Sequence, residues 1–146
     1  MAVAWPSVRS KLAASLPGVV GAGTTVYDGP VVSGDAPSRY LTIGYQPSRP
    51  EEDSGLFQQE NGPDGYAVTE VGSVLAELAA VTGSTDVPDV WATFSLIAAW
   101  VQADMTLGGT LLPGSTVTAA ATVDAAQTTS GAVQRLLITF SYSTSL

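Results

Sequence analysis

The sequence contains no cysteine, no histidine and a single lysine, Lys11. Without cysteine the chain forms no disulfide and holds no metal through thiolates. Without histidine it lacks the commonest general base, the commonest metal ligand and the usual activator of a catalytic serine. Lys11 lies outside any glycine-rich context, which excludes a phosphate-loop nucleotide site. We therefore expect no cofactor and no metal, and carboxylates are the catalytic groups that remain.

Positive charge is scarce, because five basic residues face 13 acidic ones and the net charge is −8. Affinity for nucleic acids rests largely on cations that displace counterions from phosphates, so we expect no binding to DNA or RNA. Charged residues make up 12% of the chain, against roughly 25% in an ordinary soluble domain. This shortfall indicates a surface that is partly covered by other subunits.

Long apolar runs are also missing. None approaches the ~20 residues that span a bilayer, and Arg9 and Lys11 interrupt the N-terminal segment where a signal peptide has its apolar core. The sequence therefore predicts a soluble protein made in a cytoplasm, without a membrane partner. Its 146 residues suit a single domain.

Two segments repeat apolar residues at the spacing of an amphipathic helix. The first covers residues 5–16, and Pro17 followed by Gly18 is expected to end it. The second covers residues 86–105, with Asp86 as its N-cap. Its predicted core-facing stripe consists of Val90, Phe94, Ile97, Val101 and Met105, widened by Trp91 and Ala98.

The second helix is apolar on its other side as well, where Leu96 and Trp100 lie one turn apart. A single sheet cannot bury both sides, so either the first helix or an adjacent subunit must cover this one. We assign Leu96 and Trp100 to a subunit interface, together with Arg135. Arg135 points away from the apolar stripe of its own segment and is either solvated or paired across a subunit boundary.

Strand periodicity is clearest near the C-terminus. Residues 116–126 and 132–143 alternate apolar and polar side chains, which predicts an antiparallel pair with one buried face. Two shorter segments, 24–30 and 39–46, predict strands joined by a hairpin or a wider loop.

The segment 66–83 fits both a helix and a strand. Its β-branched start and the interior Gly72 favour a long strand that bends at this glycine. Later in the chain Gly108 and Gly109 stand between a helix and a strand, the reverse of the order in a phosphate loop. Asp104 makes this junction still less suited to phosphate, so the glycines are expected to end the helix and turn the chain.

Residues 47–65 contain three prolines, three glycines and five acidic residues and follow no period. They predict a long loop that is ordered by a partner, with the adjacent apolar residues Leu56 and Phe57 as the contact. The loop also carries an acidic run, formed by Glu51, Glu52 and Asp53. No further ligand or turn glycine accompanies this run at calcium-loop spacing, which favours a solvated loop tip over a metal site.

The order of these segments resembles the tail-terminator proteins of long-tailed (siphovirus-type) bacteriophages, especially those of actinobacterial hosts. The resemblance covers most of the chain from about residue 27 onward, and its most particular motifs are "TLGGTL" and "TSGAVQRLLITFSY". These motifs shape the chain and carry no catalytic residue. The fold that the resemblance implies is a single α+β domain over residues 1–146, with two helices packed on a mostly antiparallel, curved sheet.

In that family the protein is a non-enzymatic virion component, a ring that is typically a hexamer. The ring sits on the head-proximal end of the tail tube, assembled in the host cytoplasm. It ends tail polymerisation, contacts the major tail tube protein and the head connector or stopper protein, and leaves a channel for DNA. An acidic lining would let DNA pass without specific binding. Our candidates for the lining are Glu51, Glu52, Asp53 and Asp124.

Three alternatives stay open at this point. A head–tail adaptor or completion protein of the phage neck is the nearest, because such proteins share similar folds. A small monomeric binding module would differ in its solution state. A carboxylate-based enzyme, such as a glycoside hydrolase, would need two carboxylates that converge in a pocket. Its candidates would be Glu51, Glu52, Glu60, Glu70 and Glu77.

Overall fold

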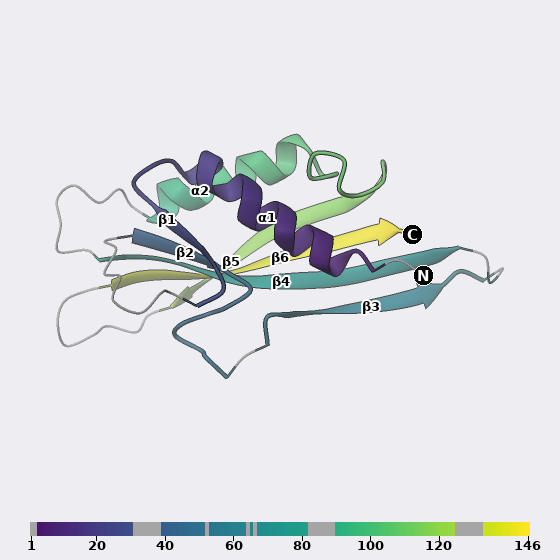
Figure 1. The fold of residues 1–146 in the computed structure, drawn as a ribbon, viewed down its shortest axis with the longest axis horizontal. Helices are drawn as coiled ribbons and strands as arrows, with labels where there is room; N and C mark the ends of the chain where they lie inside the picture. Colours follow the sequence, from purple (N-terminus) through teal and green to yellow (C-terminus); the bar gives the residue numbers. More distant parts are fainter. Residues whose placement is uncertain are drawn as a thin grey trace.

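A computed structural model describes residues 3–30, 39–51, 53–63, 65, 67–81, 90–124 and 133–146. Six strands form one sheet, and two helices pack on one of its faces (Figure 1). In chain order the elements are α1 (Trp5–Val20), β1 (Thr25–Asp28), β2 (Arg39–Ile43), β3 (Gly55–Asn61), β4 (Val68–Val81), α2 (Val90–Ala103), β5 (Thr116–Asp124) and β6 (Val133–Ser145). The expected α+β fold, with two helices on a mostly antiparallel sheet, is confirmed.

The long strand β4 organises the sheet, whose order is β1-β2-β4-β6-β5. One side of β4 pairs with β6 along nearly its whole length. The other side of β4 pairs with two strands that follow each other along it. β3 pairs with residues 68–74 of β4, and β2 pairs with residues 76–80. Among the described residues no strand pairs with the outer side of β5 or of β3. The sheet therefore has open edges on opposite sides of β4.

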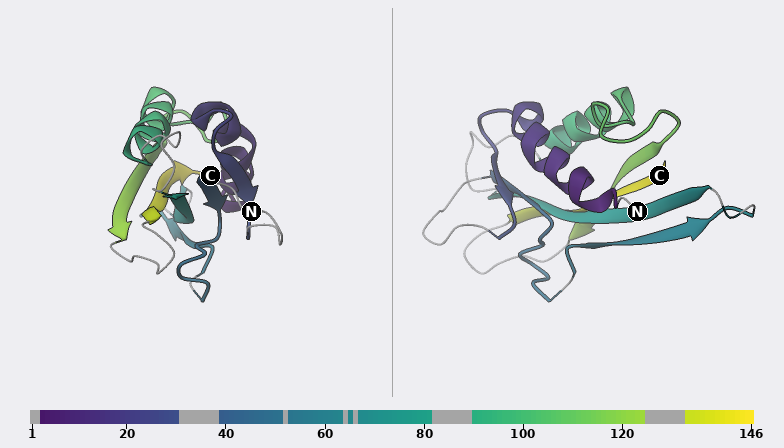
Figure 2. Two further views of the ribbon diagram at one scale, coloured as in Figure 1. Left: turned by 90° about the vertical axis from the view of Figure 1, so that its left-hand side faces the viewer. Right: turned by 45° about the vertical axis from the view of Figure 1, so that its right-hand side comes forward.

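The core lies between the helices and one face of this sheet. In the central pair Val74 lies opposite Phe140 and Leu78 opposite Leu136, and all four side chains are fully buried. α2 covers the β5 side of this face and α1 covers the β1 side (Figure 2). The buried stripe of α1 recurs every four residues, at Val8, Leu12, Leu16 and Val20.

α1 is longer than the sequence predicts, because it continues through Pro17 and Gly18 to Val20. A proline removes one backbone hydrogen bond of the helix. The extra turn buries Val20, which extends the apolar stripe by one position. The predicted stop after Leu16 is therefore wrong. The helix ends instead at Val20 and is followed by Gly21, whose φ of 84° is readily adopted only by glycine.

β1 and β2 confirm the two short strands, but they run parallel, with Val26 opposite Leu41. A tight turn joins only antiparallel neighbours, so the hairpin alternative is wrong and the wider connection holds. The connecting residues 31–38 lie outside the described part of the chain.

The loop predicted over residues 47–65 contains β3, so this prediction is wrong for residues 55–61. All seven residues of β3 pair with β4 through the backbone, yet its side chains are exposed or half-buried on both faces. A strand that is covered on neither face shows no apolar alternation in its sequence. Glu51 and Asp53 precede the strand and are exposed, whereas Glu52 lies outside the described residues.

β4 confirms the strand interpretation of residues 66–83. Gly72 permits a close approach there, because a Cβ at this position would lie 2.6 Å from the Tyr142 hydroxyl oxygen. β5 and β6 confirm the predicted antiparallel pair at the C-terminus, and residues 125–132 between them lie outside the described part.

α2 confirms the second helix, although its predicted N-cap, Asp86, lies outside the described residues. Two members of its predicted core stripe are exposed, Trp91 by 49% and Met105 by 38%. Met105 falls in the turn after the helix ends at Ala103, and Trp91 lies about 100° around the helix from the buried Val90. The buried stripe is Val90, Thr93, Ile97 and Val101.

The glycine pair turns the chain as predicted, but it does not end the helix, because α2 already ends at Ala103. Gly108 and Gly109 have φ angles of 66° and 86°. The Asp104 carboxylate accepts hydrogen bonds from the backbone N–H groups of Thr106 and Gly108, both at 3.0 Å. This turn follows the helix and directs the chain toward β5.

Candidate assembly surfaces

α2 has no charged residue among its 14 positions. Two of its large apolar residues are exposed, Leu96 by 52% and Trp91 by 49%, and they lie on opposite flanks of the buried stripe. The outer side of a surface helix ordinarily carries charged and polar residues, and exposed apolar clusters commonly mark interaction sites. Trp100, the other helical residue assigned to a subunit interface, is partly buried against the protein's own core. The outer side of α2 around Leu96 is therefore the first candidate assembly surface.

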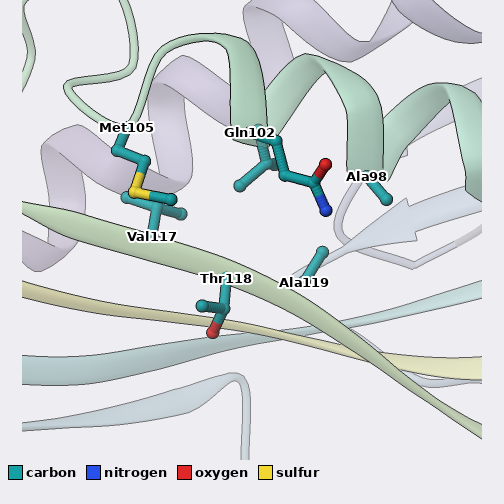
Figure 3. Close-up of a pocket in the computed structure, with 7 residues that line it drawn as sticks. Ala98, Gln102, Met105, Val117, Thr118 and Ala119 are labelled. Atoms are coloured by element: carbon teal, nitrogen blue, oxygen red, sulfur yellow. The ribbon is translucent and has the colours of Figure 1, made fainter.

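An open groove of about 260 Å³ lies between α2 and the edge strand β5 (Figure 3). Met105 extends from the turn after α2 toward Val117 of β5, and Gln102 provides a polar group on the helix side. The remaining wall is formed by small or apolar side chains, among them Ala98, Val101 and Ala119. The groove and the unpaired side of β5 together form a surface that we call the β5 edge.

The opposite side of the sheet carries a second apolar surface, which we call the β3 edge. Its exposed residues are Leu56 at 65%, Phe57 at 48% and Val71 at 45%. Phe57 lies opposite Gly72 and shares the helix-bearing face of the sheet, whereas Leu56 lies on the other face. The apolar pair assigned to partner contact is thus exposed, but it sits on a strand. The contact itself stays a prediction.

A buried carboxylate fixes β3 and α1 to the sheet. Glu70 is fully buried and accepts hydrogen bonds from the Tyr142 hydroxyl at 2.6 Å, the Gln59 amide at 2.9 Å and the Ala4 backbone N–H at 3.0 Å. Burial raises the pKa of the Glu70 carboxyl, but the hydrogen bonds from Gln59, Tyr142, Ala4 and Trp5 outweigh it, so this pKa lies below its ordinary value. The ionised carboxylate also faces the positive end of the α1 dipole.

A second buried carboxylate, Glu77, lies on the other face of β4. It accepts hydrogen bonds from the Tyr40 hydroxyl at 3.1 Å, from the Ser48 backbone N–H at 3.1 Å and from the Ser48 hydroxyl. Burial and the negative charge of Glu77 raise the pKa of Tyr40 to about 12. Because Glu70 and Glu77 point to opposite faces of the sheet, they do not converge on one substrate.

Arg135, the third residue assigned to a subunit interface, lies opposite Asp124 in β5 and Ala79 in β4. It is half-buried, and its Nε is buried without a hydrogen-bond partner among the described residues. Its charge lowers the pKa of Tyr40 and opposes the effect of Glu77. Arg135 is therefore engaged within its own protomer, and its role between subunits stays a prediction.

The candidate channel residues do not lie together. Glu51 and Asp53 precede β3 on one side of the sheet, whereas Asp124 ends β5 on the other side. Of the five basic residues only Arg49 is exposed. Arg9 forms an ion pair with Asp28 at 2.9 Å. The surface is therefore dominated by negative charge.

The sequence matches no protein-family model and no curated protein. No helix within the described ranges is long and apolar enough to cross a membrane. In the same part of the chain, no group of three or more acidic side chains is placed to hold a metal ion.

Proposed function

We propose that the chain is the structural subunit of a ring at the head-proximal end of a bacteriophage tail tube. There it ends tail polymerisation and joins the tail to the head connector. The observation that carries this proposal is the pair of apolar surfaces on opposite sides of the sheet, the β3 edge and the β5 edge beside the uncharged α2. A ring formed by rotation about one axis joins two different surfaces of each copy. The proposal is also supported by the motifs "TLGGTL" and "TSGAVQRLLITFSY", which resemble those of tail terminators.

The charge distribution supports a channel through which DNA moves. A cationic lining would bind the phosphates and retain the genome. Here four of the five basic residues are buried or half-buried, and the net charge is −8. The proposed partners are further copies of the chain, the major tail tube protein and the head connector or stopper protein.

The position of the protein in assembled particles tests this proposal. Particles are labelled with an antibody against the chain and imaged by electron microscopy. We expect label at the joint between tail and head, on a single ring of density. Label along the whole tail, or its absence from the particle, would overturn the proposal, and label confined to the head side would favour the adaptor alternative.

A further inference from the structure

No strand among the described residues pairs with the outer side of β5, which leaves this side available to another strand. Natural edge strands are usually blunted by lysine, proline, a bulge or an inward-pointing charge. The nine residues of β5, "TVTAAATVD", contain no proline and no basic residue, and the one charged residue, Asp124, is the last. The groove under α2 runs along this same edge (Figure 3). An added strand would therefore find both backbone partners and an apolar groove for one of its side chains.

β3, on the opposite side of the sheet, has the matching geometry. From β3 through β4 and β6 to β5 each neighbouring pair is antiparallel, so β3 and β5 run in opposite directions. Rotation about an axis along the strands preserves strand direction and the face that each side chain occupies. β3 of a second copy therefore meets β5 antiparallel. Its Phe57 then lies on the α2 side, and Leu56 lies on the other face, where Thr118 and Ala120 are exposed.

The charge distribution permits a second copy as the occupant at these two edges. Two chains of net charge −8 repel each other over most of their surface. α2 carries no charge, β5 carries only Asp124 and β3 carries only Glu60. The two edges are therefore places where copies approach with little repulsion.

We propose that β3 of each copy adds as a strand to β5 of the next copy, with Phe57 seated in the groove between α2 and β5. This inference rests on the proposed ring for its symmetry. The sheet is then continuous from copy to copy, and no strand edge is left open at a junction. Glu70 helps to hold the contact strand in place, because its carboxylate accepts a hydrogen bond from the Gln59 amide and so ties β3 to β4.

The absence of cysteine makes thiol cross-linking a clean test. The double variant Phe57→Cys/Ala119→Cys is treated with a short bifunctional thiol reagent, as purified chain at rising concentration and in assembled particles. We expect a ladder of covalent multimers, whereas each single variant alone gives none. A second pair, Gln58→Cys/Thr118→Cys, probes the other strand face and should cross-link as well. The matched control combines Phe57→Cys with Gly18→Cys, because a Cβ at position 18 has no atom within 4 Å.

Chemical unfolding first confirms that each variant is as stable as the parent chain. Rings or labelled particles that give no ladder with either pair would overturn the inference and leave the proposed function intact. A dimer from Phe57→Cys alone would show a symmetric contact and would also overturn it, as would an equal ladder from the control pair. Cross-linking of a protein that is absent from the joint between head and tail would overturn the proposed function and leave the strand pairing intact.

Discussion

α1 and α2 cover the same face of the sheet (Figure 2). Their exposed side chains differ in chemistry. The outer side of α1 exposes small and polar residues such as Ser10 and Ala14, and Arg9 is paired with Asp28. α2 instead exposes two large apolar residues, Leu96 and Trp91, one on each flank of its buried stripe, and has no charge. The need to bury a core explains the buried stripe of each helix. It does not explain the exposed apolar residues of α2, which an adjacent subunit would cover in the proposed ring.

Two leucines give the largest expected contrast between the helices. Leu12 of α1 is fully buried, and Leu96 of α2 is 52% exposed. Leu12→Ala should lower the free energy of unfolding by about 2–5 kcal/mol, because it leaves a cavity in the core. Leu96→Ala should change it by no more than about 0.5 kcal/mol. Urea unfolding of the dilute, dissociated chain measures both values, and equal losses would show that Leu96 is a core residue.

A negative charge introduced on the exposed surface of each helix in turn tests whether α2 forms the subunit interface. Leu96→Asp should weaken association at least ~30-fold, because burying an apolar side chain of this size contributes about 2 kcal/mol. Ala14→Asp, on the exposed side of α1, should leave association unchanged. Light scattering across a concentration series gives the two constants. If Ala14→Asp disrupts the oligomer as strongly as Leu96→Asp, the assignment of the interface to α2 is wrong.

The anchoring of α1 has a pH signature. The folded pKa of Glu70 lies below the ordinary value of 4.5, so its ionised form adds stability that is complete above that pH and declines as the pH falls through the folded pKa. Glu70→Gln should cost about 1–3 kcal/mol at neutral pH, because the donors around the carboxylate lose their charged partner. Chemical unfolding at neutral and acidic pH should show this difference shrinking below pH 4.5. Glu60→Gln, at an exposed position, is the control and should show little difference at either pH.

The last prediction concerns DNA, to which we expect no binding. Most of the cations are occupied or covered, since Arg9 is paired with Asp28, Arg39 is buried and Arg135 is half-buried. Fluorescence anisotropy with a labelled duplex at physiological salt should therefore detect no binding. Tight binding that weakens steeply as salt is added would contradict the passive channel.

The parts of the fold that the sequence predicts are those with one buried face. α2 and the β5–β6 pair show a clear period because one face of each element packs against the core. β4 is the exception, because its residues 76–80 are buried on both faces and it was recognised by its β-branched start and Gly72 instead. β3 is held in the sheet by backbone hydrogen bonds to β4, and these leave no periodic pattern of apolar side chains in the sequence. The end of α1 was missed because the burial of Val20 outweighs the local signals of Pro17 and Gly18.

The candidate surfaces show the same limit. Leu96 and the pair Leu56 and Phe57 could be recognised as apolar residues in excess of what the core needs. The anchor around Glu70 was missed, although Glu70 shares a strand face with the buried Val74. Its donor at Ala4 lies 66 residues away in the chain, and only the folded backbone brings the two together.

Electron micrographs of the purified chain at high concentration test the central claim most directly. We expect closed rings of uniform copy number with an open centre, because in the proposed ring the β3 edge of each copy adds to the β5 edge of the next. Particles that remain single subunits at every concentration, or that pair as symmetric dimers, would contradict the assembly of this chain into a ring.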